Sequence, residues 1–168
     1  MLKIEKNKLN SVYLAISEKM DLYLPIVQAG EVNYGKFFKD SETQVETLKT
    51  VKSAKDFFFP QSETMMKFRL EGKNIEINDI RSEKEPFVIF GVKACDYKSF
   101  EILDNVFLQE PVDTFYKARR DAGIIVTLAC NNPSVSCFCS TFKLDASNPK
   151  GDITSWMDND FAYFTLNT

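Results

Sequence analysis

Apolar side chains in the first part of the chain change from a helical to a strand-like spacing. In residues 10–20 they fall on one helical face, which predicts a helix with Asn10 or Ser11 as its N-cap. Residues 21–29 follow as a predicted strand. Pro25 indicates a place near a sheet edge for this strand, because proline has no backbone N–H to donate.

The middle of the chain combines strand and helix patterns. Residues 31–38 are the expected hairpin partner of the preceding strand. A helix is predicted over 62–70, where Ser62 is a suitable N-cap. In residues 67–80 apolar and polar side chains alternate on both sides of a turn at 71–74, which favours a β-hairpin.

Two continuous apolar runs stand in the second half, at 86–92 and 124–129. Such runs are typical of strands that are buried on both faces. Helices are predicted between them, over 96–108 and over 112–122. Because a strand–helix–strand connection is a crossover, the two strands are expected to be parallel neighbours.

Local signals mark the ends of these elements. Asp96 is the expected N-cap of the first helix, and Gly123 the expected C′ residue of the second. A turn at 149–151 precedes a last predicted strand, 161–166. The fold class is therefore α/β, with α+β as the alternative: one domain, 1–168, with a mixed sheet that contains a parallel pair and helices packed on its faces.

Composition narrows the range of functions. The chain has 168 residues and a net charge of −3, which argues against nucleic acid as a partner. No apolar run approaches the roughly 20 residues of a membrane span, and the N-terminus lacks the apolar region of a signal peptide. We therefore expect a cytoplasmic protein without a membrane partner, whose cysteines are reduced thiols or metal ligands.

All four cysteines lie in the second half of a chain that contains no histidine: Cys95, Cys130, Cys137 and Cys139. Cys95 and Cys130 follow the two predicted parallel strands, so both are expected at the rim formed by the strands' carboxyl ends. Cys137 and Cys139 are two residues apart and point the same way in an extended chain. Four thiolates are the number that an iron–sulfur cluster or a closed zinc site requires.

The cysteine spacing alone leaves several readings open. It follows no general ligand pattern, and four buried structural thiols are an equally ordinary outcome. A zinc site usually shows CxxC pairs, which are missing here. A thiol–disulfide role for Cys137 and Cys139 requires a small, strained ring. Cys95 lies close to a predicted helix N-terminus, which favours its thiolate.

Charged residues near the predicted rim are candidates for supporting roles. Lys93 can bind an anion there or be an ordinary solvated lysine. Arg119 and Arg120 are expected in surface ion pairs with Asp96, Asp104 or Asp113. The chain has no GxGxxG, P-loop or GxSxG motif, so no nucleotide or hydrolase site is indicated.

Several segments together resemble one known family. They are FGVKACD at 90–96, LDNVF at 103–107, DTFYKARR at 113–120, the CNNP and CFC elements within 130–139, and PQSE at 60–63. This is the family of iron–sulfur electron-transfer subunits that includes the iron–sulfur subunit of anaerobic sulfite reductase and the beta subunit of cytoplasmic sulfhydrogenases. Lys93-Ala94 stands where that family usually has Arg-Pro.

The resemblance implies that the four cysteines bind one iron–sulfur cluster, [4Fe–4S] rather than another type, with Lys93 and Asp96 beside them. It implies electron relay between a flavin-containing, NAD(P)H-oxidising subunit and a catalytic reductase or hydrogenase subunit. The family's ferredoxin-like domain is absent, so this chain is expected to be the N-terminal part of a longer subunit. The alternative is a docking domain with structural thiols and no metal.

Overall fold

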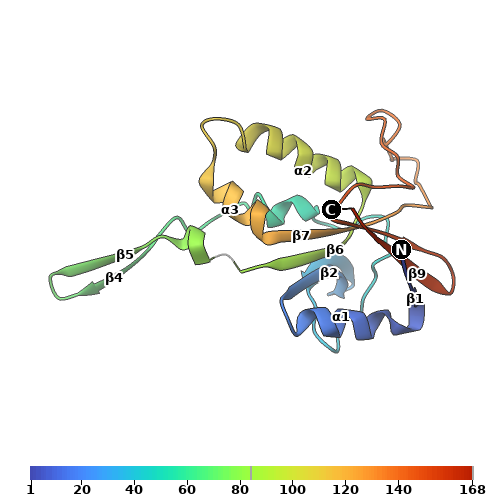
Figure 1. The fold of residues 1–168 in the computed structure, drawn as a ribbon, viewed down its shortest axis with the longest axis horizontal. Coiled ribbons are helices and arrows are strands. Elements are labelled where there is room, and N and C mark those ends of the chain that lie inside the picture. The colour runs from blue at the N-terminus through green and yellow to red at the C-terminus, as the bar shows by residue number, and fades with distance from the viewer. Residues whose placement is uncertain (84, 168) are drawn as a thin grey trace.

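The computed structural model describes residues 1–83 and 85–167, and this part of the chain is built around a seven-stranded mixed sheet (Figure 1). The strand order is β1-β9-β8-β7-β6-β2-β3. In sequence order the strands are β1 (Leu2–Glu5), β2 (Asp21–Gln28), β3 (Glu31–Lys36), β6 (Phe87–Val92), β7 (Gly123–Leu128), β8 (Ile153–Met157) and β9 (Phe161–Leu166).

Parallel strands form the centre of this sheet. β2, β6, β7 and β8 pair in parallel, whereas β3, β9 and β1 are added antiparallel at the two sides. The predicted parallel pair of strands is confirmed as β6 and β7, and the α/β class with a mixed sheet is confirmed with it.

Helices cover both faces of the sheet (Figure 1). Helix α1 (Leu9–Ser17) buries Leu9 and Tyr13 on one face, against apolar side chains of β2, β6 and β7. On the other face lie α2 (Ala94–Phe107), α3 (Thr114–Ala122) and a short 3-10 helix, Ala54–Phe57. Among the described residues, no helix combines the length and the apolar character that a membrane span needs.

The predicted N-cap of the first helix is wrong. Helix α1 begins at Leu9 with Lys8 as its N-cap, so Asn10 and Ser11 lie inside it. A 3-10 turn leads directly into the helix and replaces a side-chain cap.

Pro25 lies near a sheet edge as predicted, because β2 is the neighbour of the edge strand β3, although β2 itself is paired on both sides. The pairing with β6 ends at Tyr23, and residues 42–44 continue on that side: the Gln44 amide donates to the Pro25 carbonyl at 2.8 Å. Pro25 therefore follows the last residue of β2 that pairs with β6, so its missing N–H interrupts no hydrogen bond between these two strands.

The helix predicted over 62–70 is wrong, and the predicted hairpin is confirmed. β4 (Lys67–Glu71) and β5 (Asn74–Asn78) form a separate antiparallel pair that projects from the domain as an arm (Figure 1). Gly72 has φ +62° at the first position of the two-residue turn, a conformation that glycine adopts without strain. The alternation of apolar and polar residues was therefore the better guide to this segment than the possible helix N-cap at Ser62.

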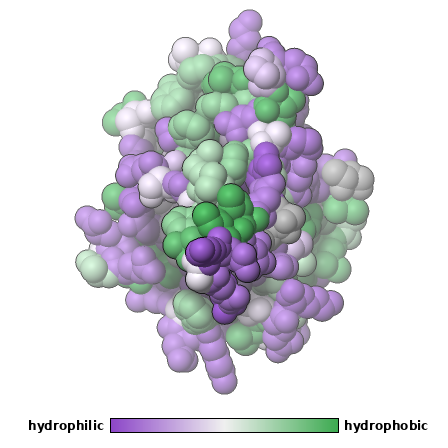
Figure 2. All heavy atoms as spheres, turned by 90° about the vertical axis from the view of Figure 1, so that its left-hand side faces the viewer, coloured by the Kyte–Doolittle hydropathy of each residue, from purple (hydrophilic) through white to green (hydrophobic). Residues whose placement is uncertain are grey.

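The arm has one apolar and one polar face. Phe68 is paired with Ile77, and Leu70 with Ile75, so these four side chains lie on the same face. Each is about two-thirds exposed to solvent. Figure 2 views the molecule from the end that carries the arm and shows apolar atoms at its centre with polar atoms beside them. Within the described structure this face is not covered by another element.

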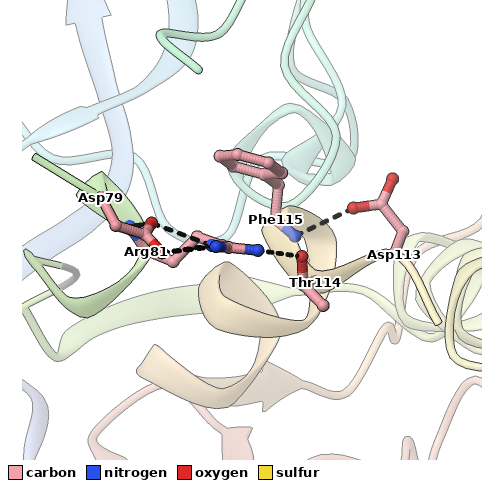
Figure 3. A network of polar contacts seen from close by, with 5 residues as sticks. All are labelled: Asp79, Arg81, Asp113, Thr114 and Phe115. Carbon is pink, nitrogen blue, oxygen red and sulfur yellow. Dashed lines mark hydrogen bonds and ion pairs between the residues drawn. The ribbon is translucent and has the colours of Figure 1, made fainter. Parts of the chain in front are cut away.

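A polar network fixes the base of the arm to α3 (Figure 3). Arg81 donates from Nε to both Asp79 oxygens, at 2.8 and 2.9 Å, and from Nη1 to Thr114 Oγ1 at 2.7 Å. Its guanidinium also lies 5.1 Å from the centre of the Phe115 ring. Asp113 caps α3 by accepting hydrogen bonds from the amides of Phe115 and Tyr116, both at 2.9 Å.

Gly123 has a different role from the predicted helix C′ residue. It is the first residue of β7 and its backbone is extended. A Cβ atom at this position would lie 2.5 Å from Cε1 of Phe58. Glycine is therefore required by close packing between strand and loop rather than by helix termination.

The two arginines of α3 differ in burial. Arg120 forms the expected ion pair with Asp104. Arg119 is almost fully buried: its guanidinium pairs with Glu63 and donates from Nε to the Phe58 carbonyl at 2.9 Å. The predicted surface ion pair is therefore wrong for Arg119, which instead attaches the segment around Pro60 to the domain.

Replacing Arg119 with Ala should lower the free energy of unfolding by about 3 kcal/mol, because it leaves a buried carboxylate and a carbonyl without their partner. Urea unfolding measures this. Lys117→Ala, which removes an exposed helical ion pair with Asp121, should cost less than about 0.5 kcal/mol. Equal losses for the two variants would contradict the role given to Arg119.

Candidate thiol site

The site begins at a bulge in β6. Gly91 has φ +87°, and the register between β6 and β7 shifts between Phe90 and Val92. A Cβ on Gly91 would meet Cδ of Pro25 at 3.4 Å, in a backbone conformation that other residues rarely adopt. Because of the bulge, Val92 turns into the core beneath α2. The chain then leaves the sheet at Lys93, at the carboxyl end of the parallel strands.

Helix α2 carries the first thiol in its first turn. Its N-cap is Lys93, whose side chain makes no cap hydrogen bond, so the prediction of Asp96 as N-cap is wrong. Asp96 instead accepts a hydrogen bond from Ser53 Oγ at 2.7 Å. Cys95 is half-buried beside it. This places one thiol and one carboxylate at the start of α2, next to the segment that leads to the 3-10 helix.

The other three thiols lie on the loop that follows β7. Cys130 is held by its amide, which donates to the Ala146 carbonyl at 2.8 Å. Cys139 accepts at its carbonyl from Leu144 N at 2.9 Å, which folds the loop back on itself. Cys130 and Cys139 are half-buried, whereas Cys137 is exposed. Residues 131–152 contain no regular helix or strand, so turns alone position Cys137 and Cys139.

All four cysteines line one cavity of about 320 Å³. Lys93, Asp96, Lys49 and Ser53 line it as well. The expectation that sequence-distant thiols share one rim of the sheet therefore agrees with the structure. Within the described residues, however, no group of three or more Cys, Asp or Glu side chains is close enough to hold a metal ion as it stands. The four thiols share a cavity without converging on one point.

The thiols differ in acidity. Burial, and then the neighbouring Asp96 and Cys139, raise the pKa of Cys95 to about 11, and its own amide and that of Asp96 lower it less. The expected help from the helix N-terminus is present but outweighed. Hydrogen bonds from Ser134 lower the pKa of Cys137, since its amide donates to Cys137 Sγ at 3.3 Å. Lys49 lowers it further, but less.

Sequence reasoning missed the segment that lines the cavity from another part of the chain. Lys49 and Ser53 lie before the 3-10 helix, in a stretch without motif or periodicity. The ammonium of Lys49 hydrogen-bonds Ser136 Oγ beside Cys137. On β3, burial, and then the charges of Asp96 and Cys95, raise the pKa of the Tyr34 hydroxyl. No signal in the sequence links these residues to the cysteines.

The fold and the cavity define an α/β domain with a thiol-lined cavity at the carboxyl end of its parallel strands. The chain is similar to a protein named sulfhydrogenase 2 subunit beta, from Pyrococcus furiosus, with 29% identity over 151 residues. The match covers 87% of this chain and 43% of the relative, so the chain spans less than half the relative's length. No family model and no solved structure matches the chain.

This similarity supports the predicted relatedness to sulfhydrogenase beta subunits. The iron–sulfur cluster, its ligands and the partner subunits stay predictions.

Alkylation should distinguish the thiols. We expect iodoacetamide to label Cys137 first at pH 7, because its thiol is exposed and acidified, and Cys95 last. Labelling of Cys95 should rise roughly tenfold per pH unit below its pKa, since the thiolate is the nucleophile. Mass spectrometry of peptides over time measures both rates. Ser134→Ala removes the hydroxyl 3.7 Å from Cys137 Sγ but keeps the amide donor, so it should slow labelling of Cys137 modestly and leave Cys95 unchanged. Faster labelling of Cys95 than of Cys137 at pH 7 would contradict the assignment.

Proposed function

We propose that this chain is an electron-transfer domain of a multisubunit oxidoreductase and binds one iron–sulfur cluster through Cys95, Cys130, Cys137 and Cys139. The observation that carries the proposal is the single cavity lined by all four thiols. The relative's name, a beta subunit of a sulfhydrogenase, supports a role inside an oxidoreductase complex. We further propose that electrons pass from a flavin-containing, NAD(P)H-oxidising subunit to a catalytic reductase or hydrogenase subunit.

The residues present fit such a group in donor type, number and space. Four thiols and no histidine match cysteinyl ligation, and the cavity volume of about 320 Å³ leaves room between them. Cys95 and Cys130 are fixed by α2 and β7, whereas Cys137 and Cys139 belong to a loop held by turns. Binding therefore requires this loop to move toward the strand ends.

When bound, the cluster supplies one-electron transfer. The chain's own residues hold it, exclude water and set the local charge. The ligating thiols must lose their protons on binding, and for Cys95, with its raised pKa, this costs most. We propose a [4Fe–4S] cluster because four cysteines are its ordinary ligand set.

Anaerobic reconstitution with iron and sulfide tests the cluster. The parent domain should take up about four irons and show visible absorption, as expected for a [4Fe–4S] cluster. Cys137→Ser with Cys139→Ser should lose most of both, because half of the ligands are gone. Ser140→Ala, in the same loop, should load like the parent. A parent domain that retains only trace iron and no visible absorption would rule out the cluster.

A second function is favoured by the arm. Its four apolar side chains form a face that another subunit of the same complex can cover, which supports a docking domain with structural thiols. Two copies facing each other through four side chains apiece would bury roughly 1,000 Å², below the usual size of a stable interface.

The two functions predict opposite results in the assembled complex. If the domain only docks, Cys137→Ser with Cys139→Ser should leave NAD(P)H-linked electron transfer unchanged. If it carries electrons through the cluster, the same variant should assemble normally and lose at least tenfold in electron-transfer rate. Subunit composition by native mass spectrometry provides the assembly control.

A further inference from the structure

Lys93 is a buried lysine without a direct partner. The residue as a whole is 8% exposed, and no side-chain hydrogen bond or ion pair joins it to another residue in the described part of the chain. It lines the thiol cavity and also a neighbouring cavity of about 300 Å³, so it lies in the wall between them. An enclosed ammonium group without a counter-charge is unfavourable, so an anionic group in either cavity would be stabilised by it.

Nearby carboxylates do not neutralise Lys93. Glu46 lines the neighbouring cavity, but its carboxylate already pairs with Lys6 at 2.5 Å. Asp96 accepts the hydrogen bond from Ser53. Both groups act on Lys93 from a distance without direct contact. The positive charge therefore remains available to whatever occupies the thiol cavity.

Lys93 and the four thiols line the same cavity. Burial lowers the pKa of Lys93, and Cys130 opposes this more than Glu46, Cys95 or Asp96 does. Neutral thiols offer no negative charge, but metal-bound cysteines are thiolates. With four thiolates, a [4Fe–4S] cluster carries a net charge of about −2 when oxidised and one more negative charge when reduced.

We propose that Lys93 is the positioning residue that sets the reduction potential of the site: its buried ammonium stabilises the extra negative charge that arrives with the electron. The inference rests on the proposed function. In this step one electron enters from an external reductant, a reduced flavin in the complex or dithionite in the tube. No bond forms or breaks and no proton needs to move. Lys93 thus favours the reduced form by electrostatic attraction in a poorly solvated site.

Three variants test this on the anaerobically reconstituted chain. Lys93→Met removes the charge and keeps the length of the side chain, Lys93→Arg keeps the charge, and Lys117→Met removes an exposed cation of α3 that does not line the cavity. Iron content is measured first, and the midpoint potential then by redox titration followed by electron paramagnetic resonance. Circular dichroism confirms the fold of each variant, and Lys93→Gln replaces the Met variant if that one unfolds.

We expect Lys93→Met to load iron like the parent and to lower the reduced-to-oxidised ratio at fixed potential at least tenfold, which is 59 mV for one electron. Lys93→Arg and Lys117→Met should stay within threefold of the parent, because the first keeps the charge and the second removes a charge that solvent screens. If the Met and Gln variants fold but take up no iron, while the Arg variant takes up iron, the result would also support Lys93 as a counter-charge to the cluster.

Two results overturn the inference separately from the proposed function. A loaded Lys93→Met variant with the parent's potential shows that Lys93 does not tune the site, while the cluster stands. If the Lys93→Arg variant folds but takes up no iron, a positive charge at position 93 is not sufficient for cluster binding. If the parent itself takes up no iron, the proposed function fails and the role of Lys93 fails with it.

Discussion

The parallel pairing of β6 with β7 is the constraint on which the site depends. Because both strands run in the same direction, their carboxyl ends meet, and the residues that follow them are brought to one rim. Cys95 and Cys130 are 35 positions apart in the sequence, yet both line one cavity as a result. The bulge at Gly91 completes this arrangement, since it directs the chain from the sheet into α2.

Burial shifts the pKa values of two ionisable groups at this rim in opposite directions. Burial raises the pKa of Cys95 and lowers that of Lys93, so each is pushed toward its neutral form when the cavity holds nothing charged. A metal centre with thiolate ligands reverses both effects at once. It stabilises the deprotonated cysteine, and its negative charge stabilises the ammonium. One metal centre would therefore stabilise both the Cys95 thiolate and the Lys93 ammonium.

The sequence predicted those parts of the fold that are written in local periodicity. The apolar runs of β6 and β7 and the helices between them were found because burial on both faces leaves an unbroken hydrophobic pattern. β8 was missed since its buried Thr154 and Ser155 look polar, and they are accommodated by donating to the carbonyls of Pro149 and Thr127 at 2.8 and 2.7 Å. β1 was missed because it pairs with β9, at the other end of the chain.

The candidate site shows the same division. Topology could place Cys95 and Cys130, and residue spacing could orient Cys137 relative to Cys139. Lys49 and Ser53 could not be found, because they reach the cavity through tertiary contacts alone. The burial of Lys93 was equally hidden: a lysine after a strand is ordinarily solvated, and its enclosure by Glu46, Leu48 and the loop after β7 appears only in three dimensions.

The most direct test of the central claim is a crystal structure of the anaerobically reconstituted chain, with data collected at the iron absorption edge. The account predicts anomalous density in the cavity between β6, β7 and the loop that follows, with the four cysteine sulfurs each about 2.3 Å from iron, as for other metal–thiolate bonds. Iron bound elsewhere, or four sulfurs that remain apart around a cavity without iron, would contradict it.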